Sequence, residues 1–185
     1  GFTGSLSGDA YFGTSIAPLG DFDGDSIPDL VVGAPRQNED VTRDGAIFIL
    51  LLKADGTVKN HFKISQLVGN LNQFLRLNDR FGQSVTTLGD MDGDSIPEIA
   101  VGMAGLSSNE SGAVYVLFLT PNGTVKNNGS IKIALGQGGF MGTLGIGDQF
   151  GGDVSSLGDL DGDSIPDLVV SAPRNDQGGN DVGSL

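Results

Sequence analysis

The chain has 185 residues, of which 38% are apolar, and this is sufficient for one domain with a hydrophobic core. Its formal net charge of −13 excludes nucleic acid as a partner, because phosphate binding requires clustered Lys and Arg side chains. The 31 glycines, without a collagen-type period, indicate the many tight turns of an all-β fold. The absence of Cys is compatible with a reducing compartment or with an extracellular protein that is stabilised by metal.

The chain shows no sign of a membrane segment or of a secretion signal. No apolar run is long enough to span a membrane. The N-terminus lacks a basic segment followed by an apolar one. We therefore expect the chain, which begins at Gly1 and not at Met, to be a mature product or an excised piece with no membrane span.

An internal repeat organises the sequence. Three similar acidic loops start 69 residues apart, at Asp21–Asp29, Asp90–Glu98 and Asp159–Asp167. A Phe-Gly pair begins nine residues before each loop, at Phe12-Gly13, Phe81-Gly82 and Phe150-Gly151. Because the spacing and the flanks recur in register, the chain is expected to repeat one supersecondary unit.

Each unit is predicted to contain four short strands. The first follows the Phe-Gly pair, and the second follows the acidic loop as a mostly apolar run, which indicates burial on both faces. The third, at 45–52 and 112–119, is rich in β-branched and aromatic residues. The fourth, at 57–64 and 124–133, follows a tight hairpin turn at Asp55-Gly56 or Asn122-Gly123.

Four antiparallel strands that recur in this way are typical of the blades of a β-propeller. The approximate units are 1–69, 70–138 and 139–185 of a single domain, 1–185, and the connections at 66–79 and 136–148 are predicted to vary, with one helical turn in 66–79. The third unit stops within its third strand, which leaves about 2.7 blades. Because propellers usually close with roughly four to eight blades, we expect a fragment of a longer propeller or contacts supplied by neighbouring copies.

The acidic loops hold 12 of the 23 acidic residues and are predicted to bind three Ca²⁺ ions, one in each loop. Carboxylates at loop positions one, three, five and nine would repel one another strongly without a cation between them. Ca²⁺ accepts roughly six to eight hard oxygen ligands, and the backbone carbonyl at position seven adds another oxygen. The predicted ligands are Asp21, Asp23, Asp25, Ile27 and Asp29 in the first loop, Asp90, Asp92, Asp94, Ile96 and Glu98 in the second, and Asp159, Asp161, Asp163, Ile165 and Asp167 in the third.

Other interpretations of the loops agree less well with the sequence. An EF-hand requires flanking helices and Glu at position twelve, where this chain has Val32, Val101 or Val170. Mg²⁺ prefers stricter octahedral sites, and zinc is disfavoured because the chain has no Cys and one His, His61. Simple solvated acidic turns remain an alternative, which three copies at identical spacing disfavour.

These motifs resemble the FG-GAP repeat, the blade unit of integrin α-subunit propellers. The Phe-Gly pairs are followed by Gly33-Ala34-Pro35 in the first unit, by a degenerate Gly102-Met103-Ala104 in the second and by Ser171-Ala172-Pro173 in the third. The resemblance implies a β-propeller whose loops hold Ca²⁺ and a role in adhesion and ligand recognition. The glycine that the family usually has at loop position six is Ser26, Ser95 or Ser164 here.

The sequence therefore predicts an extracellular or cell-surface calcium-binding module that recognises a protein or glycan ligand. Weak calcium binding of about 10⁻⁴ to 10⁻³ M, which is typical of extracellular modules, favours an outside location. The candidate docking loops are 36–44, 106–111 and 174–181. Three N-glycosylation sequons begin at Asn109, Asn122 and Asn128.

Two alternatives stay open. One is a structural subunit of a surface fibre or sheath that assembles with copies of itself, because an open sheet edge can pair with another copy. The other is the non-catalytic part of a larger secreted enzyme. Catalysis by this chain is not predicted, because it has no Gly-x-Ser-x-Gly motif and no phosphate-binding glycine loop with Lys, and His61 lies in a predicted strand as a surface or packing residue.

Overall fold

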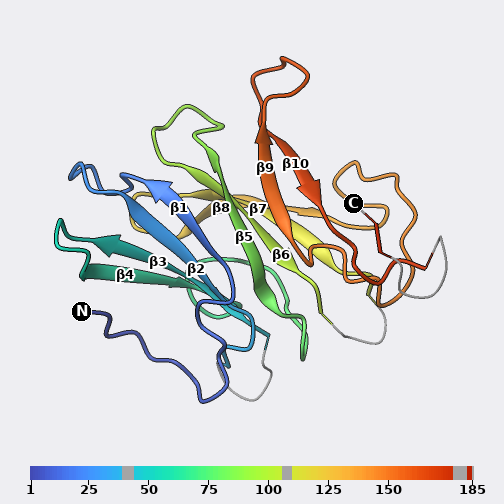
Figure 1. Cartoon of the computed structure of the whole chain (residues 1–185), viewed down its shortest axis with the longest axis horizontal. Coiled ribbons are helices and arrows are strands. Elements are labelled where there is room, and N and C mark those ends of the chain that lie inside the picture. The colour runs from blue at the N-terminus through green and yellow to red at the C-terminus, as the bar shows by residue number, and fades with distance from the viewer. Residues whose placement is uncertain (39–43, 106–109, 177–182, 185) are drawn as a thin grey trace.

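The computed structural model describes residues 1–38, 44–105, 110–176 and 183–184, and within these ranges all regular structure is β-strand. The strands form two sheets of four and one of two, arranged side by side (Figure 1). The first sheet contains β1 (Ile16–Gly20), β2 (Asp29–Ala34), β3 (Ala46–Leu52) and β4 (Val58–Ile64). The second contains β5 (Phe81–Gly89), β6 (Glu98–Met103), β7 (Ala113–Leu119) and β8 (Val125–Ile133), and the third contains β9 (Val154–Gly158) and β10 (Asp167–Val170).

Strands that follow one another in the chain are neighbours in each sheet and run antiparallel. The sheets are stacked through their first strands, because β5 lies beside β1 and β2, and β9 lies beside β5. This arrangement is that of consecutive propeller blades, and it confirms the predicted all-β fold with blades of four antiparallel strands.

The second and third strands form the centre of each complete sheet. Every residue of β6 is buried, and so is every residue of β2 except Leu30. The apolar runs in these strands fit this environment, because a strand covered on both faces has no polar side. The prediction of burial on both faces is wrong for β10, whose four residues are only half-buried. Among the described residues, β10 pairs with β9 alone, and the single bridge between Ala172 and Ser184 lies just after it in the chain.

The hairpins between third and fourth strands form where the sequence predicts them. In the first, the Gly56 N–H donates to the Lys53 carbonyl at 2.8 Å, and the Thr57 hydroxyl donates to Asp55 at 2.7 Å. In the second, the Gly123 N–H donates to the Thr120 carbonyl at 2.9 Å. Only the glycine of each predicted dipeptide has a positive φ, 78° at Gly56 and 65° at Gly123.

The Phe-Gly pair of one unit packs on the second strand of the unit before it. Phe81 is fully buried, and its N–H donates to the Asp44 carbonyl at 2.9 Å. A Cβ atom at Gly33 would lie 2.1 Å from the Gly82 carbonyl oxygen, which no real structure tolerates. The same close approach recurs between Gly102 and the backbone of the third unit. These glycines are therefore required for the contact between consecutive sheets.

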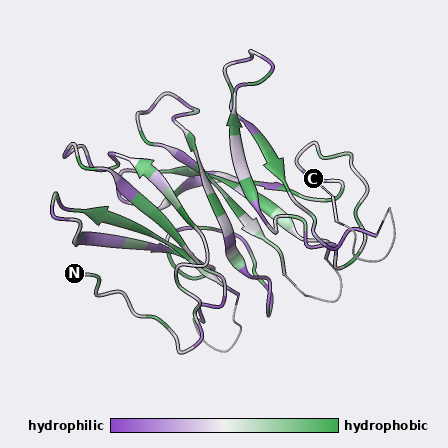
Figure 2. Cartoon of the chain, viewed as in Figure 1, coloured by the Kyte–Doolittle hydropathy of each residue, from purple (hydrophilic) through white to green (hydrophobic). Residues whose placement is uncertain are grey.

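The apolar core lies between the sheets. The largest cluster joins the first two units and includes Ile47, Ile49, Phe81, Tyr115 and Leu117. A second cluster joins the second and third units, and a third covers the outer face of the first unit. Figure 2 shows hydrophobic residues concentrated in the strands and hydrophilic stretches in the loops. No helix in the described part of the chain is long and apolar enough to cross a membrane.

The connection at 66–79 contains no helix, so the predicted helical turn is wrong. Asn70, Asn72 and Asn78 have φ values of 59°, 50° and 65°, in the left-handed region, which ends a right-handed helix. Side-chain hydrogen bonds hold this extended path instead. The Asn70 amide donates to the Val125 carbonyl at 2.8 Å, and the Leu75 N–H donates to Gln66 Oε1 at 2.7 Å.

Candidate metal centres

The three acidic loops join the first strand to the second in each unit, and they lie at the same end of the sheets (Figure 1). At the end of each first strand the pairing register shifts. The glycine at this bulge has a positive φ: 72° at Gly20, 71° at Gly89 and 70° at Gly158. A bulge with glycine in the left-handed region bends the strand, so the same local structure starts each loop.

The first aspartate of each loop accepts hydrogen bonds from the loop backbone. Asp21 Oδ1 accepts from the Asp25 N–H at 2.9 Å, and Asp21 Oδ2 accepts from the Ser26 N–H at 2.8 Å. Asp90 and Asp159 accept equivalent bonds at 2.7–3.1 Å. Aspartate bonds of this kind stabilise tight turns, and they fix the position of each carboxylate.

The serine at loop position six is strained in all three copies. Ser26, Ser95 and Ser164 have φ values of 68°, 71° and 71°. A non-glycine residue costs roughly 1–2 kcal/mol in this left-handed conformation. The departure from the glycine of the FG-GAP motif therefore preserves the shape of the loop, at a cost in backbone strain.

The last carboxylate of each loop connects the loop to its sheet. Asp29 accepts hydrogen bonds from the Phe22 N–H at 3.0 Å and from the Leu52 N–H at 2.8 Å. Glu98 Oε2 accepts from the Met91 N–H at 2.7 Å, and Asp167 Oδ2 accepts from the Leu160 N–H at 2.8 Å. Asp29 and Glu98 are fully buried, whereas Asp167 is half-buried.

The structure brings three of the predicted carboxylates together in each loop. In each set, one carboxylate oxygen from each residue lies within 4.8 Å of the other two. The sets are Asp21, Asp23 and Asp29 in the first loop, Asp90, Asp92 and Asp94 in the second, and Asp159, Asp161 and Asp167 in the third. Asp25, Glu98 and Asp163 are not part of these sets. Ile27, Ile96 and Ile165 contact the site through their N–H groups, which donate to the position-five carboxylates at 2.8–2.9 Å. Their carbonyls remain predicted ligands.

The buried carboxylates show why a cation fits these loops. Burial, the largest effect, raises the pKa of Asp29 and of Glu98 above their ordinary values, and the negative charges of neighbouring loop aspartates act in the same direction. Glu98 Oε1 is buried and has no hydrogen-bond partner among the described residues. A buried carboxylate oxygen without a partner destabilises the fold, and an ion with hard oxygen preference would supply the missing interaction. The donor set therefore fits Ca²⁺.

Two lysines that the sequence reasoning did not assign to the sites contact them directly. On β4, Lys59 Nζ lies 2.7 Å from Asp23 and 2.6 Å from Asp25. On β8, Lys126 occupies the same place and contacts Asp94 at 2.8 Å. The signal in the sequence is the repeated Thr-Val-Lys-Asn at 57–60 and 124–127, which marks the lysine as a position common to both units. Among the described residues, no lysine contacts the third loop.

The other residues singled out in the sequence lie away from the loops. The ring of His61 packs on Phe2, with 4.9 Å between ring centroids, which agrees with a packing role. Asn122 lies exposed in the second hairpin turn, and Asn128 is exposed on β8 with a φ of 57°. Asn109 lies outside the described residues.

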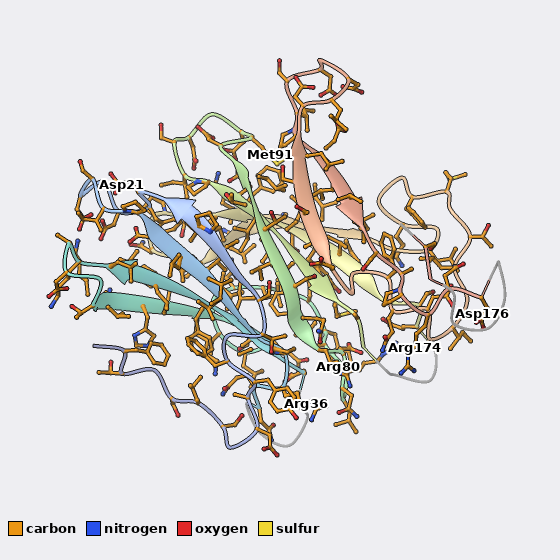
Figure 3. The ribbon with its side chains drawn as sticks, in the orientation of Figure 1. Asp21, Arg36, Arg80, Met91, Arg174 and Asp176 are labelled. Atoms are coloured by element: carbon orange, nitrogen blue, oxygen red, sulfur yellow. The ribbon has the colours of Figure 1, made fainter. Side chains whose placement is uncertain are left out.

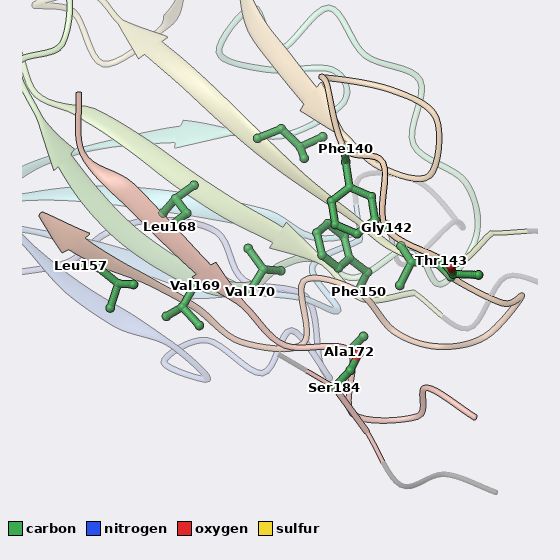
Figure 4. A pocket seen from close by; sticks show the side chains of 12 residues that line it. Phe140, Gly142, Thr143, Phe150, Leu157, Leu168, Val169, Val170, Ala172 and Ser184 are labelled. Atoms are coloured by element: carbon green, nitrogen blue, oxygen red, sulfur yellow. The ribbon is translucent and has the colours of Figure 1, made fainter. Parts of the chain in front are cut away.

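An apolar hollow of about 570 Å³ lies beside β10, lined by residues of the third unit and by Ile133 of β8 (Figure 4). Its walls include Phe140, Leu144 and Phe150 on one side, and Leu168 and Val170 of β10 on the other. In the contact between the first two units, the third strand of the second unit, β7, contributes Tyr115 and Leu117 to the core. Within the described part of the third unit no such strand covers β10, so this apolar surface remains open.

Comparison with known proteins agrees with these repeats. The model of the FG-GAP repeat matches residues 12–50, 81–117 and 150–185. The chain is 32% identical over 170 residues to integrin alpha-2 of Mus musculus, which is 88% of this chain and 13% of the integrin. It is 30% identical to integrin alpha-PS2 of Drosophila melanogaster and to integrin alpha-V of Gallus gallus, over 90% and 92% of this chain but only 12% and 16% of those proteins.

The three matched segments each contain a Phe-Gly pair, an acidic loop and the second strand, and the first two extend into the third strand. Together they cover more than half of the chain. The relatives match most of the chain, which in turn spans a small part of their length. By the agreement of motif, sheet topology and sequence identity, the chain belongs to the FG-GAP repeat family, with an integrin α-like β-propeller fold.

Proposed function

We propose that the chain is an extracellular recognition module in which three Ca²⁺ ions stabilise the blades. The observation that carries the proposal is the recurrence of one carboxylate cluster in three loops. In each cluster three carboxylate oxygens lie within 4.8 Å of one another. Such clusters repel strongly unless a cation lies among them.

The proposed role of the ion is structural. Each loop joins the first and second strands of a unit, and its last carboxylate also accepts a hydrogen bond from the loop backbone. In the first loop, the proposed ligands are Asp21, Asp23, Asp25, Asp29 and the Ile27 carbonyl. An ion bound by them would neutralise the loop and hold β1 and β2 together. The corresponding residues would hold the ions in the second and third loops.

Thermal unfolding tests the calcium role. In 2 mM CaCl₂ the melting temperature should exceed that in EGTA, because an ion that binds only the folded state stabilises it by about 1.4 kcal/mol at nine times its Kd. MgCl₂ should have a smaller effect. Calorimetric titration should give three sites. An Asp55→Asn variant, which removes a carboxylate outside the loops, should keep the full calcium effect, whereas equal melting temperatures in CaCl₂ and EGTA would contradict the proposal.

The proposed partner is a protein or glycan ligand outside the cell. The relatives are named integrin alpha subunits, and the same fold presents loops between the second and third strands at the end opposite the acidic loops. Such loops are free to vary without disturbing the sheets. Parts of the candidate docking loops, 39–43, 106–109 and 177–182, lie outside the described residues. The proposal includes no catalytic activity.

Self-assembly is a second candidate, and the open hollow beside β10 favours it. Apolar surface of this kind, next to a strand whose outer edge pairs with no other strand among the described residues, is suited to contact with another copy of the chain. Light scattering in CaCl₂ and in EGTA separates the two candidates. Particles larger than the monomer support assembly, and a monomer at all concentrations supports the recognition module alone.

A further inference from the structure

Three arginines, contributed by the three units, lie at the end of the sheets opposite the acidic loops. Figure 3 shows Arg36, Arg80 and Arg174 across this end, and Asp21 in its loop at the other. Arg36 and Arg174 occupy equivalent positions, 138 residues apart, directly after the proline that follows each second strand. Arg80 directly precedes Phe81, the first residue of β5.

The backbone holds all three arginines in defined positions. The Arg36 N–H donates to the Ala10 carbonyl, and the Arg174 N–H donates to the Asp148 carbonyl, both at 3.1 Å. Arg80 has a φ of 58°, and its carbonyl accepts a hydrogen bond from the Gln83 N–H at 3.0 Å. The three side chains therefore project from backbone positions that these hydrogen bonds fix.

Tyr11 orients one of these side chains. The Arg36 guanidinium carbon lies over the Tyr11 ring, 4.3 Å from its centroid, in a cation–π contact. Tyr11 is also the equivalent of Arg80 in the first unit, 69 residues earlier, and has nearly the same φ, 56°. The equivalent residue in the third unit is Gln149, with a φ of 61°.

Within the described ranges of the chain, the three arginines have no carboxylate as an ion-pair partner. Burial lowers the pKa of Arg80, and the positive charges of Arg36 and Arg174 lower it further. Among the described residues, no Asp or Glu forms an ion pair with any of the three. Arg76, by contrast, forms an ion pair with Glu110 at 2.9 Å. An anion bound among the three arginines would relieve the repulsion that Arg36 and Arg174 exert on Arg80.

We propose that Arg36, Arg80 and Arg174 form an anion-binding surface that takes the carboxylates of an acidic protein segment. This inference rests on the proposed recognition role and names the chemistry of the partner. The guanidinium fork matches a carboxylate in a bidentate geometry. The strong negative charge of the whole chain disfavours a long polyanion, whereas a short acidic segment contacts little beyond the arginines.

Fluorescence anisotropy with three probes tests the proposal. The probes are a labelled hexa-aspartate peptide, its hexa-asparagine counterpart and a heparin-derived oligosaccharide, each titrated with the full chain in CaCl₂ at low and at physiological salt. We expect the hexa-aspartate peptide to bind, more weakly at high salt, and the hexa-asparagine peptide not to bind. Absence of hexa-aspartate binding, or tighter binding of the oligosaccharide than of the peptide, would overturn the proposal.

Variants separate this surface from general effects on the fold. Arg80→Gln should weaken hexa-aspartate binding about tenfold, which corresponds to one charge-assisted pair. It should fold normally, because Gln149 occupies the same backbone conformation in the third unit. Arg36→Gln and Arg174→Gln should each weaken binding as well, and Arg76→Gln is the matched control that should not. Equal binding by the Arg80→Gln and native chains would overturn the proposal.

The calcium role and the anion-binding surface can fail independently. If calcium leaves the melting temperature unchanged while the peptide still binds through Arg80, the calcium role is wrong and the anion-binding surface stands. If calcium stabilises the chain while the peptide does not bind, the anion-binding surface is wrong and the calcium role stands.

Discussion

Lys59 on β4 contacts Asp23 in the loop between β1 and β2, with 2.7 Å between Nζ and Oδ2. The same ammonium lies 2.6 Å from Asp25 Oδ2, so one lysine from the last strand of the sheet bridges two predicted metal ligands near the first. Lys126 repeats this bridge in the second unit, to Asp92 and Asp94. The positive charge of the lysine therefore partly neutralises the loop, as the ion would.

Replacement of Lys59 with Met should destabilise the chain more in the absence of calcium than in its presence. The hydrogen bond from Lys59 is the largest cause of the lowered pKa of Asp25, so the pair stabilises the ion-free loop. In EGTA the Lys59→Met variant should melt below the native chain. In calcium the difference should shrink, because the first loop binds Ca²⁺ more tightly once the competing ammonium is absent.

The measurements for this prediction are melting curves in EGTA and CaCl₂ and a calcium titration of both chains. Lys53→Met, in the exposed hairpin turn, is the control. It should change neither the melting temperature nor the calcium affinity. Weaker calcium binding by Lys59→Met would show that the lysine orients the ligands and does not compete with the ion.

A second prediction concerns Glu98, whose Oε1 atom is buried and has no hydrogen-bond partner among the described residues. Glu98→Gln removes a buried charge and retains an oxygen that can accept from the Met91 N–H, which now lies 2.7 Å from Oε2. The variant should melt at or above the native temperature in EGTA. In calcium it should lose the stabilisation that the second ion supplies, about 1.4 kcal/mol at nine times the Kd.

Calorimetric titration should show two calcium sites in Glu98→Gln and three in the native chain. Gln83→Glu adds a carboxylate outside the loops and serves as a control with three sites. Three unchanged sites in Glu98→Gln would mean that Glu98 is not a ligand, which is compatible with the set formed by Asp90, Asp92 and Asp94 alone.

The repeat, the sheet topology and the position of the loops could be predicted from the sequence, because each depends on local patterns. The acidic loop, the apolar second strand and the glycine turns recur in the same order, and the loops start 69 residues apart. The lysine bridge could not be predicted, because Lys59 is 36 residues from Asp23 and the contact depends on how β4 lies against the loop. The incorrect helical turn at 66–79 has the same origin, since Asn70 is held by the distant Val125 carbonyl.

A third prediction is that the pH dependence of stability reverses when calcium is removed. The pKa values of Asp29 and Glu98 are raised in the folded state above ordinary values of 3.8 and 4.5. Groups with raised pKa stabilise the fold fully below the unfolded value, and this contribution is lost as pH rises through the folded value. In EGTA, stability should therefore increase as pH falls through the raised pKa values of Asp29 and Glu98 toward their ordinary values.

In saturating calcium the same titration should act in the opposite direction, because a protonated carboxylate no longer binds the ion. Below the ordinary value of 3.8, the ion-free chain should also lose stability as Asp25 and Asp94, whose pKa values are lowered mainly by their lysines, become protonated. Urea unfolding at a series of pH values measures both curves. Parallel curves in EGTA and calcium would contradict a role for Asp29 and Glu98 as ligands.

The fourth prediction tests the contact between consecutive sheets. Gly33→Ala places a Cβ atom 2.1 Å from the Gly82 carbonyl oxygen, which belongs to the rigid backbone of the next unit. The two sheets must separate to accept it, and overpacking of this kind costs about 1–3 kcal/mol. Gly8→Ala is the matched control, since its Cβ would meet no heavy atom within 4 Å. Urea unfolding should show a clear loss of stability for Gly33→Ala and a change within about 0.5 kcal/mol for Gly8→Ala. Equal stability of the two variants would mean that the units do not pack through the Phe-Gly pair as described, and that the glycines of the repeat serve another purpose.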